Sequence, residues 1–167
     1  MNYLKIDKCD YLNGAGVGVA LWLSGCDHHC KGCQNPSSWD VRAGKAFDIN
    51  TEEELIECLK FPYISHLTLT GGDPLYEENL EDVLNLVNKI SLLFPDKNIW
   101  IYSGYSWSDI SKDPKRKEIV SKCDVLVDGE YIDELRDTTL KWRGSKNQNV
   151  IDVKKSMVEG KIVLYEV

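Results

Sequence analysis

Residues 17–33 read VGVALWLSGCDHHCKGC, which joins an apolar segment to a cysteine-rich loop. The segment Val17–Leu23 is short, apolar and rich in residues that favour a buried β-strand. The loop after it places Cys26, Cys30 and Cys33 at the spacing CxxxCxxC. We therefore predict a strand whose carboxyl end carries three thiols on one short loop.

Strand-like and helix-like patterns alternate along the rest of the sequence. In residues 80–93, apolar side chains recur at the three- and four-residue spacing of a helix. Further helices are expected near residues 51–60, after a capping box that begins at Thr51, and over parts of 106–120. Strands are expected at residues 66–70, 98–102, 124–127 and 161–167. This alternation is typical of an α/β fold with a parallel sheet, and we expect a single domain over residues 1–167.

The composition limits the class of protein. The chain has 167 residues, of which 43% are hydrophobic, so it can bury a core without disulfides. Its net charge of -7 comes from 27 acidic and 20 basic side chains and argues against a nucleic-acid partner. The first residues contain no apolar signal segment, and no stretch approaches the roughly 18 apolar residues of a membrane span. We therefore expect a cytoplasmic protein with no membrane partner.

The six cysteines divide into a cluster of three and three dispersed residues. Disulfides are rare in a reducing compartment, so the cluster needs another explanation. The dispersed residues Cys9, Cys58 and Cys123 have apolar or strand-adjacent neighbours, and we predict that they are core residues.

Four interpretations of the clustered cysteines are open on spacing alone, and the simplest is that they are three unrelated core residues. A structural zinc site would take its fourth ligand from His28, His29 or a distant cysteine. A redox pair would use Cys30 and Cys33 and leave Cys26 idle. An iron–sulfur cluster with three cysteine ligands would leave one iron open for catalysis. Both histidines are otherwise expected to be solvated loop residues.

Candidate site residues also follow the other expected strands. Gly71, Gly72 and Asp73 come directly after one strand, and Ser103 and Asp128 stand at the ends of two later strands. Functional residues of parallel α/β folds gather at the carboxyl ends of strands, so we expect these residues to line one cavity. The two glycines lack Cβ and would let main chain approach a ligand closely, although a tight turn is the alternative. Ser103 and Asp128 could instead cap the turns that follow them.

Three other features carry less specific expectations. Trp39 and Trp142 are predicted to be packing residues. The basic residues 115–117 are expected to form a solvated helix face. The polar segment Arg143–Gln148 could contact a partner or tie down the C-terminal region, and the sequence leaves both open.

Together, the cysteine spacing and Gly71-Gly72-Asp73-Pro74 resemble the radical S-adenosylmethionine superfamily. Within it, the chain resembles the family that activates anaerobic ribonucleoside-triphosphate reductases, in the order of its motifs and over nearly its whole length. These motifs are Asn13-Gly14, Ser24-Gly25-Cys26, Cys30-x-Gly-Cys33-x-Asn35, Gly71-Gly72-Asp73-Pro74-Leu75, Val127-Asp128-Gly129 and Trp142-Arg143-Gly144-Ser145-x-Asn147-Gln148. Asp73 stands where much of the superfamily has Glu, but this family tolerates Asp there.

The resemblance implies a [4Fe-4S] cluster on Cys26, Cys30 and Cys33, with S-adenosylmethionine on the fourth iron. An electron from reduced flavodoxin or a similar donor would cleave S-adenosylmethionine to methionine and a 5'-deoxyadenosyl radical. That radical would remove a hydrogen from a glycine of the reductase, so no catalytic acid or base is needed from the protein. The residues expected to border the cofactors are Gly32, Cys33, Gln34, Gly71, Gly72, Asp73, Ser103 and Asp128.

The resemblance also implies an incomplete parallel β/α barrel of the radical S-adenosylmethionine type. The length of 167 residues is well below the roughly 250 of a full eight-unit barrel, and a partial barrel would leave a lateral opening for a glycine loop. One alternative is an activase of another glycyl radical enzyme, such as a lyase. The Trp142–Gln148 motif and the absence of a second ferredoxin-like cysteine set argue against it. The other alternative is a zinc-stabilised binding module without catalysis.

Overall fold

A computed structural model describes residues 1–167, and its strands form one seven-stranded sheet in the order β3-β1-β2-β4-β5-β6-β7. The strands are β1 (Asn2–Asp10), β2 (Gly18–Leu23), β3 (Lys45–Ala46), β4 (His66–Gly71), β5 (Asn98–Tyr102), β6 (Val125–Asp128) and β7 (Asn149–Asp152). The helices are α1 (Ile49–Leu59), α2 (Leu80–Leu93), α3 (Trp107–Lys112), α4 (Pro114–Ser121) and α5 (Val153–Glu159). Short 3-10 turns lie at η1 (Pro36–Ser38), η2 (Glu77–Asn79) and η3 (Asp133–Leu135).

The sheet is mixed in direction. The four strands β2, β4, β5 and β6 are parallel, whereas β1 and β3 at one edge and β7 at the other are antiparallel to their neighbours. The prediction of an α/β fold is confirmed, and the prediction of an all-parallel sheet is wrong at both edges. β1 carries charges and is mostly half-buried, and β7 is four residues long with polar ends, so neither shows the apolar pattern of a central strand.

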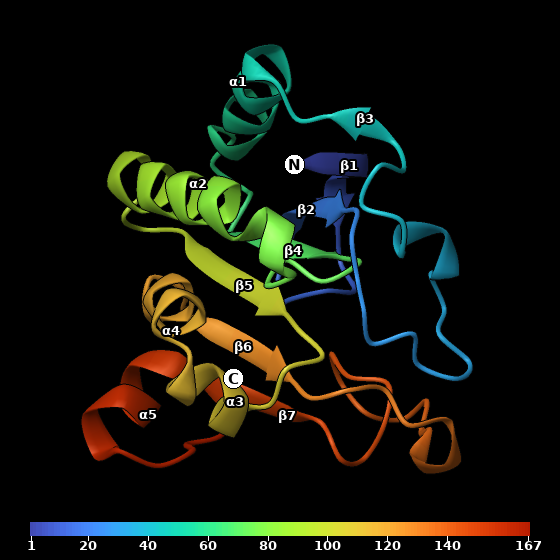
Figure 1. The fold of residues 1–167 in the computed structure, drawn as a ribbon. Coiled ribbons are helices and arrows are strands. Elements are labelled where there is room, and N and C mark those ends of the chain that lie inside the picture. Colours follow the sequence, from blue (N-terminus) through green and yellow to red (C-terminus); the bar gives the residue numbers. More distant parts are fainter.

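Alternation along the parallel strands separates the two faces of the sheet. In β4, Leu67 and Leu69 belong to the main hydrophobic core, together with Leu55 of α1 and Leu86 of α2. Thr68, which lies between them, points to the opposite face. In Figure 1 the arrowheads of β5 and β6 point toward the side of the molecule that carries the blue loop after β2 and the orange segment after β6. The helices thus cover one face, and the strand ends meet the long loops.

Several helix boundaries follow local capping. α2 occupies residues 80–93 as predicted, and α3 begins with the expected capping box between Ser106 and Asp109. The predicted start at Thr51 is wrong, because Asp48 accepts a hydrogen bond from the Thr51 amide and starts α1 at Ile49.

Two expectations at other positions also need correction. Cys58 and Cys123 are buried in the core as predicted, but Cys9 is exposed. The expected strand at 161–167 does not form. Instead, Leu164 makes an isolated bridge to Ile151, and backbone hydrogen bonds from Asp152 to Val163 and from Tyr165 to Val150 hold this C-terminal segment beside β7. There Tyr165 packs edge-on against Trp100 with ring centroids 5.1 Å apart.

No helix of the chain combines the length and the apolar character that crossing a membrane requires.

Candidate functional site

A cavity of about 390 Å³ lies where the parallel strands end, a size typical of small-molecule sites. We call it the thiol cavity because Cys26, Cys30 and Cys33 all line it. Its floor is a row of side chains from the four parallel strands, which face away from the helices. Strand register aligns these residues, and they are Trp22, Thr70, Tyr102 and Val127.

The cysteine loop, residues 24–35, forms one wall of the thiol cavity. Backbone hydrogen bonds fix its two ends, from the Gly25 amide to the Ser38 carbonyl (2.7 Å) and from the Cys33 amide to the Cys30 carbonyl (3.1 Å). All three cysteines are unpaired and partly buried. Burial raises the pKa of Cys26 to about 11 and also raises the pKa of Cys30. Metal binding at these sulfurs would therefore have to displace protons.

The two glycines after β4 bring this wall close to the strand ends. The Gly72 amide donates to the Leu23 carbonyl (2.8 Å), and the next amide donates to the Gly25 carbonyl (2.7 Å). A Cβ on Gly72 would lie 2.5 Å from the Gly25 carbonyl oxygen, and one on Gly71 would lie 2.5 Å from the Leu23 carbonyl oxygen. Both glycines line the thiol cavity, but the close approach they allow is to the chain's own backbone.

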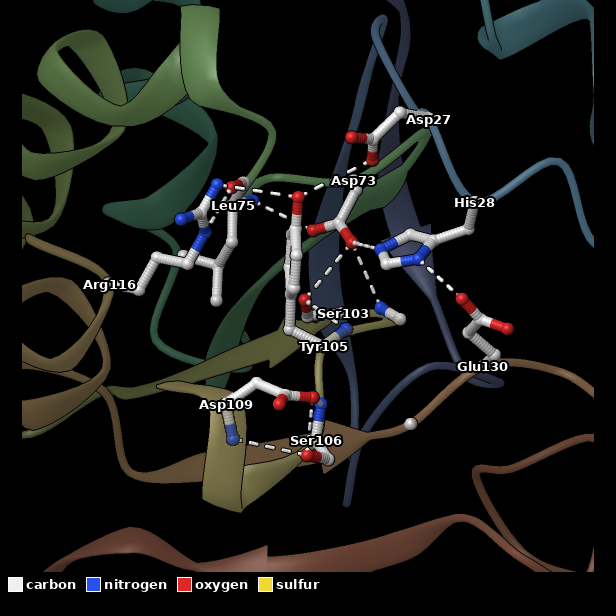
Figure 2. Close-up of polar contacts among 12 residues, drawn as sticks. Asp27, His28, Asp73, Leu75, Ser103, Tyr105, Ser106, Asp109, Arg116 and Glu130 are labelled. Atoms are coloured by element: carbon white, nitrogen blue, oxygen red, sulfur yellow. Dashed lines mark hydrogen bonds and ion pairs between the residues drawn. The ribbon is translucent and has the colours of Figure 1, made fainter. Parts of the chain in front are cut away.

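Asp73 is the polar hub of the site. Its carboxylate is buried, and one oxygen accepts hydrogen bonds from the Ser103 hydroxyl (3.0 Å) and the Gly104 amide (2.9 Å). The other oxygen accepts from the Leu75 amide (2.8 Å). The His28 ring completes the set, with Nε2 2.8 Å from the Asp73 carboxylate, as Figure 2 shows. Asp73 thereby joins the ends of β4 and β5 to the cysteine loop.

His28 is not the solvated loop residue that was expected. Its Nδ1 lies 2.9 Å from a Glu130 carboxylate oxygen, and its side chain is only 9% exposed. Burial disfavours the charged ring, but hydrogen bonds and charge attraction from Asp73 and then Glu130 outweigh it and raise the pKa of His28 to about 9. His29 does lie exposed, and it stacks on Trp39 with ring centroids 4.5 Å apart.

Arg116 is a second residue for which the prediction of a solvated side chain is wrong. Its side chain is 12% exposed, its Nε donates to the Leu75 carbonyl (3.0 Å), and its guanidinium lies over the Tyr105 ring. The Tyr105 ring in turn meets the His28 ring edge-on, with centroids 4.6 Å apart (Figure 2). The neighbouring basic residues on α4 are not part of this stack.

Most of the predicted site residues come together, and two do not. Those that line the thiol cavity are Cys26, Cys30, Cys33, Gln34, Gly71, Gly72, Asp73 and Ser103. Gly32 lies in the cysteine loop but faces Asp133. Asp128 lines a neighbouring polar cavity, where its carboxylate accepts from the Trp107 and Asn149 amides, so it ties α3 to β7. The expectation that Asp128 lies in the thiol cavity is therefore wrong.

The segment Arg143–Gln148 lines the far wall of the thiol cavity. The Gln148 side chain accepts hydrogen bonds from the Gly144 and Ser145 amides and donates to the Gly129 carbonyl (2.9 Å). Trp142 donates from its indole nitrogen to the Gly14 carbonyl (3.1 Å) and packs on Trp100, as its predicted packing role requires. These contacts tie the segment to the turn after β6, and its contact with a partner stays a prediction.

The donor set of the thiol cavity fits an iron–sulfur cluster with a small polar ligand. Three unpaired thiols face one space, and two buried polar atoms beside them, Asn35 Nδ2 and the Tyr102 hydroxyl, have no partner in the protein. Such groups are costly to leave unsatisfied, so they favour a ligand with hydrogen-bond acceptors. No three His, Cys, Asp or Glu side chains are placed around a single metal ion. A [4Fe-4S] cluster spreads its thiolates over separate irons and needs only sulfurs that share a cavity.

Sequence reasoning missed several residues of this site. Trp22 and Tyr102 could have been found from strand alternation, because each directly follows an apolar core residue of its strand and must face away from the core. His28 carried one signal, its position between two clustered cysteines. Its partner Glu130 follows a different strand and gave none.

Replacing Gly72 with alanine tests the close approach between the two strand-end loops. The new Cβ would meet backbone oxygens of Gly25 and Ser38, which cannot move without shifting the cysteine loop. We expect a loss of about 1–3 kcal/mol in the free energy of unfolding, measured by urea denaturation. Gly144→Ala is the control, because its Cβ would meet only side-chain atoms, the movable Tyr131 ring at 3.0 Å and the Gln148 side chain at 3.8 Å. Equal losses in the two variants would contradict the packing described.

Comparison with known proteins agrees with the geometry of the site. A family model described as a 4Fe-4S single cluster domain matches residues 12–151. The anaerobic ribonucleoside-triphosphate reductase-activating protein of Enterobacteria phage T4 is 46% identical over 150 residues, covering 90% of this chain and 93% of that protein. The proteins of the same name from Haemophilus influenzae (43%; 89% and 96% covered) and Escherichia coli K12 (39%; 90% and 97% covered) are also similar. The chain therefore belongs to the family of anaerobic ribonucleoside-triphosphate reductase-activating proteins.

Proposed function

We propose that this protein generates the glycyl radical of an anaerobic ribonucleoside-triphosphate reductase by radical S-adenosylmethionine chemistry. The observation that carries the proposal is the set of three unpaired thiols on one loop, facing a cavity at the carboxyl ends of parallel strands. The names of the relatives give the reductase as their target, and the matched family model is a 4Fe-4S domain. We propose the same target for this chain.

Cys26, Cys30 and Cys33 would hold a [4Fe-4S] cluster and leave one iron without a protein ligand. S-Adenosylmethionine would bind at that iron and occupy the rest of the thiol cavity. When bound, the reduced cluster supplies the electron that splits S-adenosylmethionine into methionine and a 5'-deoxyadenosyl radical. No general acid or base is required from the chain for the hydrogen abstraction that follows.

The chain's own residues would bind and shield the reacting groups. Gln34 and the main chain of Gly71–Asp73 border the space beside the cysteine loop. The Asp73 carboxylate is already bound to four groups of the protein, so we assign it the shaping of this wall rather than direct contact with the cofactor. Trp22 and Val127 on the floor would keep water and quenching groups away from a radical.

The four parallel strands would correspond to part of the barrel of radical S-adenosylmethionine enzymes. The barrel would stay open because the strands next to them, β1 and β7, are antiparallel. Reduced flavodoxin or a similar protein would supply the electron, and the protein would act in the cytoplasm. Gly32 would act by allowing the turn of the cysteine loop, at φ +75°, rather than by contact with the cofactor.

The activation assay tests this proposal. After anaerobic reconstitution, the protein should contain about four irons and, with reductant and S-adenosylmethionine, should produce a glycyl radical signal on the reductase. Cys26→Ala, Cys30→Ala and Cys33→Ala should each abolish the signal, while Cys58→Ala should retain it if the variant folds. One zinc and no iron would support a structural zinc site instead. A silent reductase beside an activated lyase would move the assignment to another glycyl radical enzyme.

Tyr102→Phe tests whether the unpaired hydroxyl serves a ligand. Burial raises the pKa of Tyr102, so this hydroxyl stays protonated and can donate a hydrogen bond. Since the hydroxyl has no partner in the protein, its removal should leave the free energy of unfolding unchanged or higher. The Kd for S-adenosylmethionine of the reconstituted protein should rise about 2- to 10-fold, as measured by equilibrium binding. Destabilisation together with unchanged binding would contradict this role.

A further inference from the structure

We propose that His28 is a positioning residue, which clamps the cysteine loop between the strand-end residue Asp73 and Glu130 and so holds the three thiols toward one cavity. The clamp itself is a property of the metal-free chain. That the loop binds an iron–sulfur cluster rests on the proposed function.

The central part of the cysteine loop lacks backbone support. None of the amides of residues 27–32 donates a hydrogen bond to a backbone carbonyl, and the loop contains no helix or strand. Cys30 lies within this unsupported part, and Cys26 and Cys33 lie directly before and after it. Side chains must therefore hold it in place.

His28 is the buried side-chain tether of this part. Its two ring nitrogens reach in opposite directions, 2.8 Å from the Asp73 carboxylate and 2.9 Å from the Glu130 carboxylate (Figure 2). The other ion pair of the loop joins Lys31 to Glu134, and both of those side chains are largely exposed. Exposed pairs contribute little, and the hydrogen bond that Asp27 accepts from the Tyr105 hydroxyl is long (3.4 Å) and exposed, so His28 provides the main buried hold on the loop.

The surroundings of His28 are shaped to receive its ring. A Cβ on Gly104 would lie 2.4 Å from the ring, so the absence of a side chain there makes the space. The Tyr105 ring closes the space edge-on, and Arg116 lies over the far side of Tyr105. The Asp73 carboxylate is also held by Ser103, Gly104 and Leu75, none of which belongs to the cysteine loop, so His28 ties the loop to a carboxylate that has three other partners.

The two hydrogen bonds of His28 are unequal. Asp73 is 1% exposed, whereas the Glu130 side chain is 55% exposed. A hydrogen bond to a buried charged group is the stronger of the two, so Asp73 provides the main hold. Glu130→Gln should consequently loosen the cysteine loop much less than a substitution of His28.

Thiol alkylation of the metal-free, reduced protein tests the clamp. We compare His28→Phe, which keeps a ring against Gly104 but removes both nitrogens, with His29→Phe at the exposed neighbour. Modification by iodoacetamide is followed at each cysteine by mass spectrometry. We expect Cys26 and Cys30 to react about 10- to 100-fold faster in His28→Phe, with rates in His29→Phe within about threefold of the parent protein. The phenylalanine ring brings no group that activates a thiol, so an acceleration reports release of the loop.

The dispersed cysteines separate a local effect from global unfolding. Cys9 is exposed and should react equally in all variants, and Cys123 is buried and should stay unreactive. Acceleration at Cys123 equal to that at Cys26 would overturn the proposal, because it would show a loss of overall stability. Unchanged rates at Cys26 and Cys30 in His28→Phe would overturn it as well.

A second measurement uses the reconstituted protein. Iron should leave His28→Phe for a chelator at least about fivefold faster than it leaves the parent or His29→Phe, and His28→Gln should restore part of the retention through its one amide donor. Equal iron release in the parent and His28→Phe would overturn the clamp while leaving the proposed function standing. A parent protein that takes up no iron would refute the proposed function, and the alkylation pattern would still decide the clamp.

Discussion

In-register alignment of the parallel strands β2, β4, β5 and β6 is the constraint on which the site depends. Because these strands run in one direction, their carboxyl ends finish at the same edge, and the loops after them converge there. The same register places Trp22, Thr70, Tyr102 and Val127 in one row beneath the thiols. The helices on the other face are free to form the hydrophobic core, so stability and function occupy opposite sides of one sheet.

Asp73 converts this alignment into a fixed cavity wall. A buried carboxylate needs several donors, and those present come from the turn after β4, the turn after β5 and the cysteine loop. Each donor therefore fixes one of the loops around the thiols. An acidic residue at this place can thus be required for the shape of the site without touching a cofactor, and the same reasoning gives His28 its place in the loop.

The parts of the molecule that sequence predicted are those set by local pattern. The cysteine spacing, the apolar alternation of β4 and the helical spacing of residues 80–93 each appear within a few neighbouring residues. The incorrect parts depend on distant partners. β1 and β7 are strands because their neighbours offer free edges, Arg116 is buried because it lies over Tyr105, and Asp128 is turned from the thiols by two backbone amides. No pattern of neighbouring residues in the sequence predicts such contacts.

We propose that the thiol cavity holds an iron–sulfur cluster with one iron open to S-adenosylmethionine. Electron paramagnetic resonance of the anaerobically reconstituted and reduced protein tests it most directly, with spectra taken before and after S-adenosylmethionine is added. We expect a [4Fe-4S] signal whose shape changes on addition, because S-adenosylmethionine would bind at the open iron. A cluster signal that S-adenosylmethionine leaves unchanged, or no iron signal at all, would contradict it.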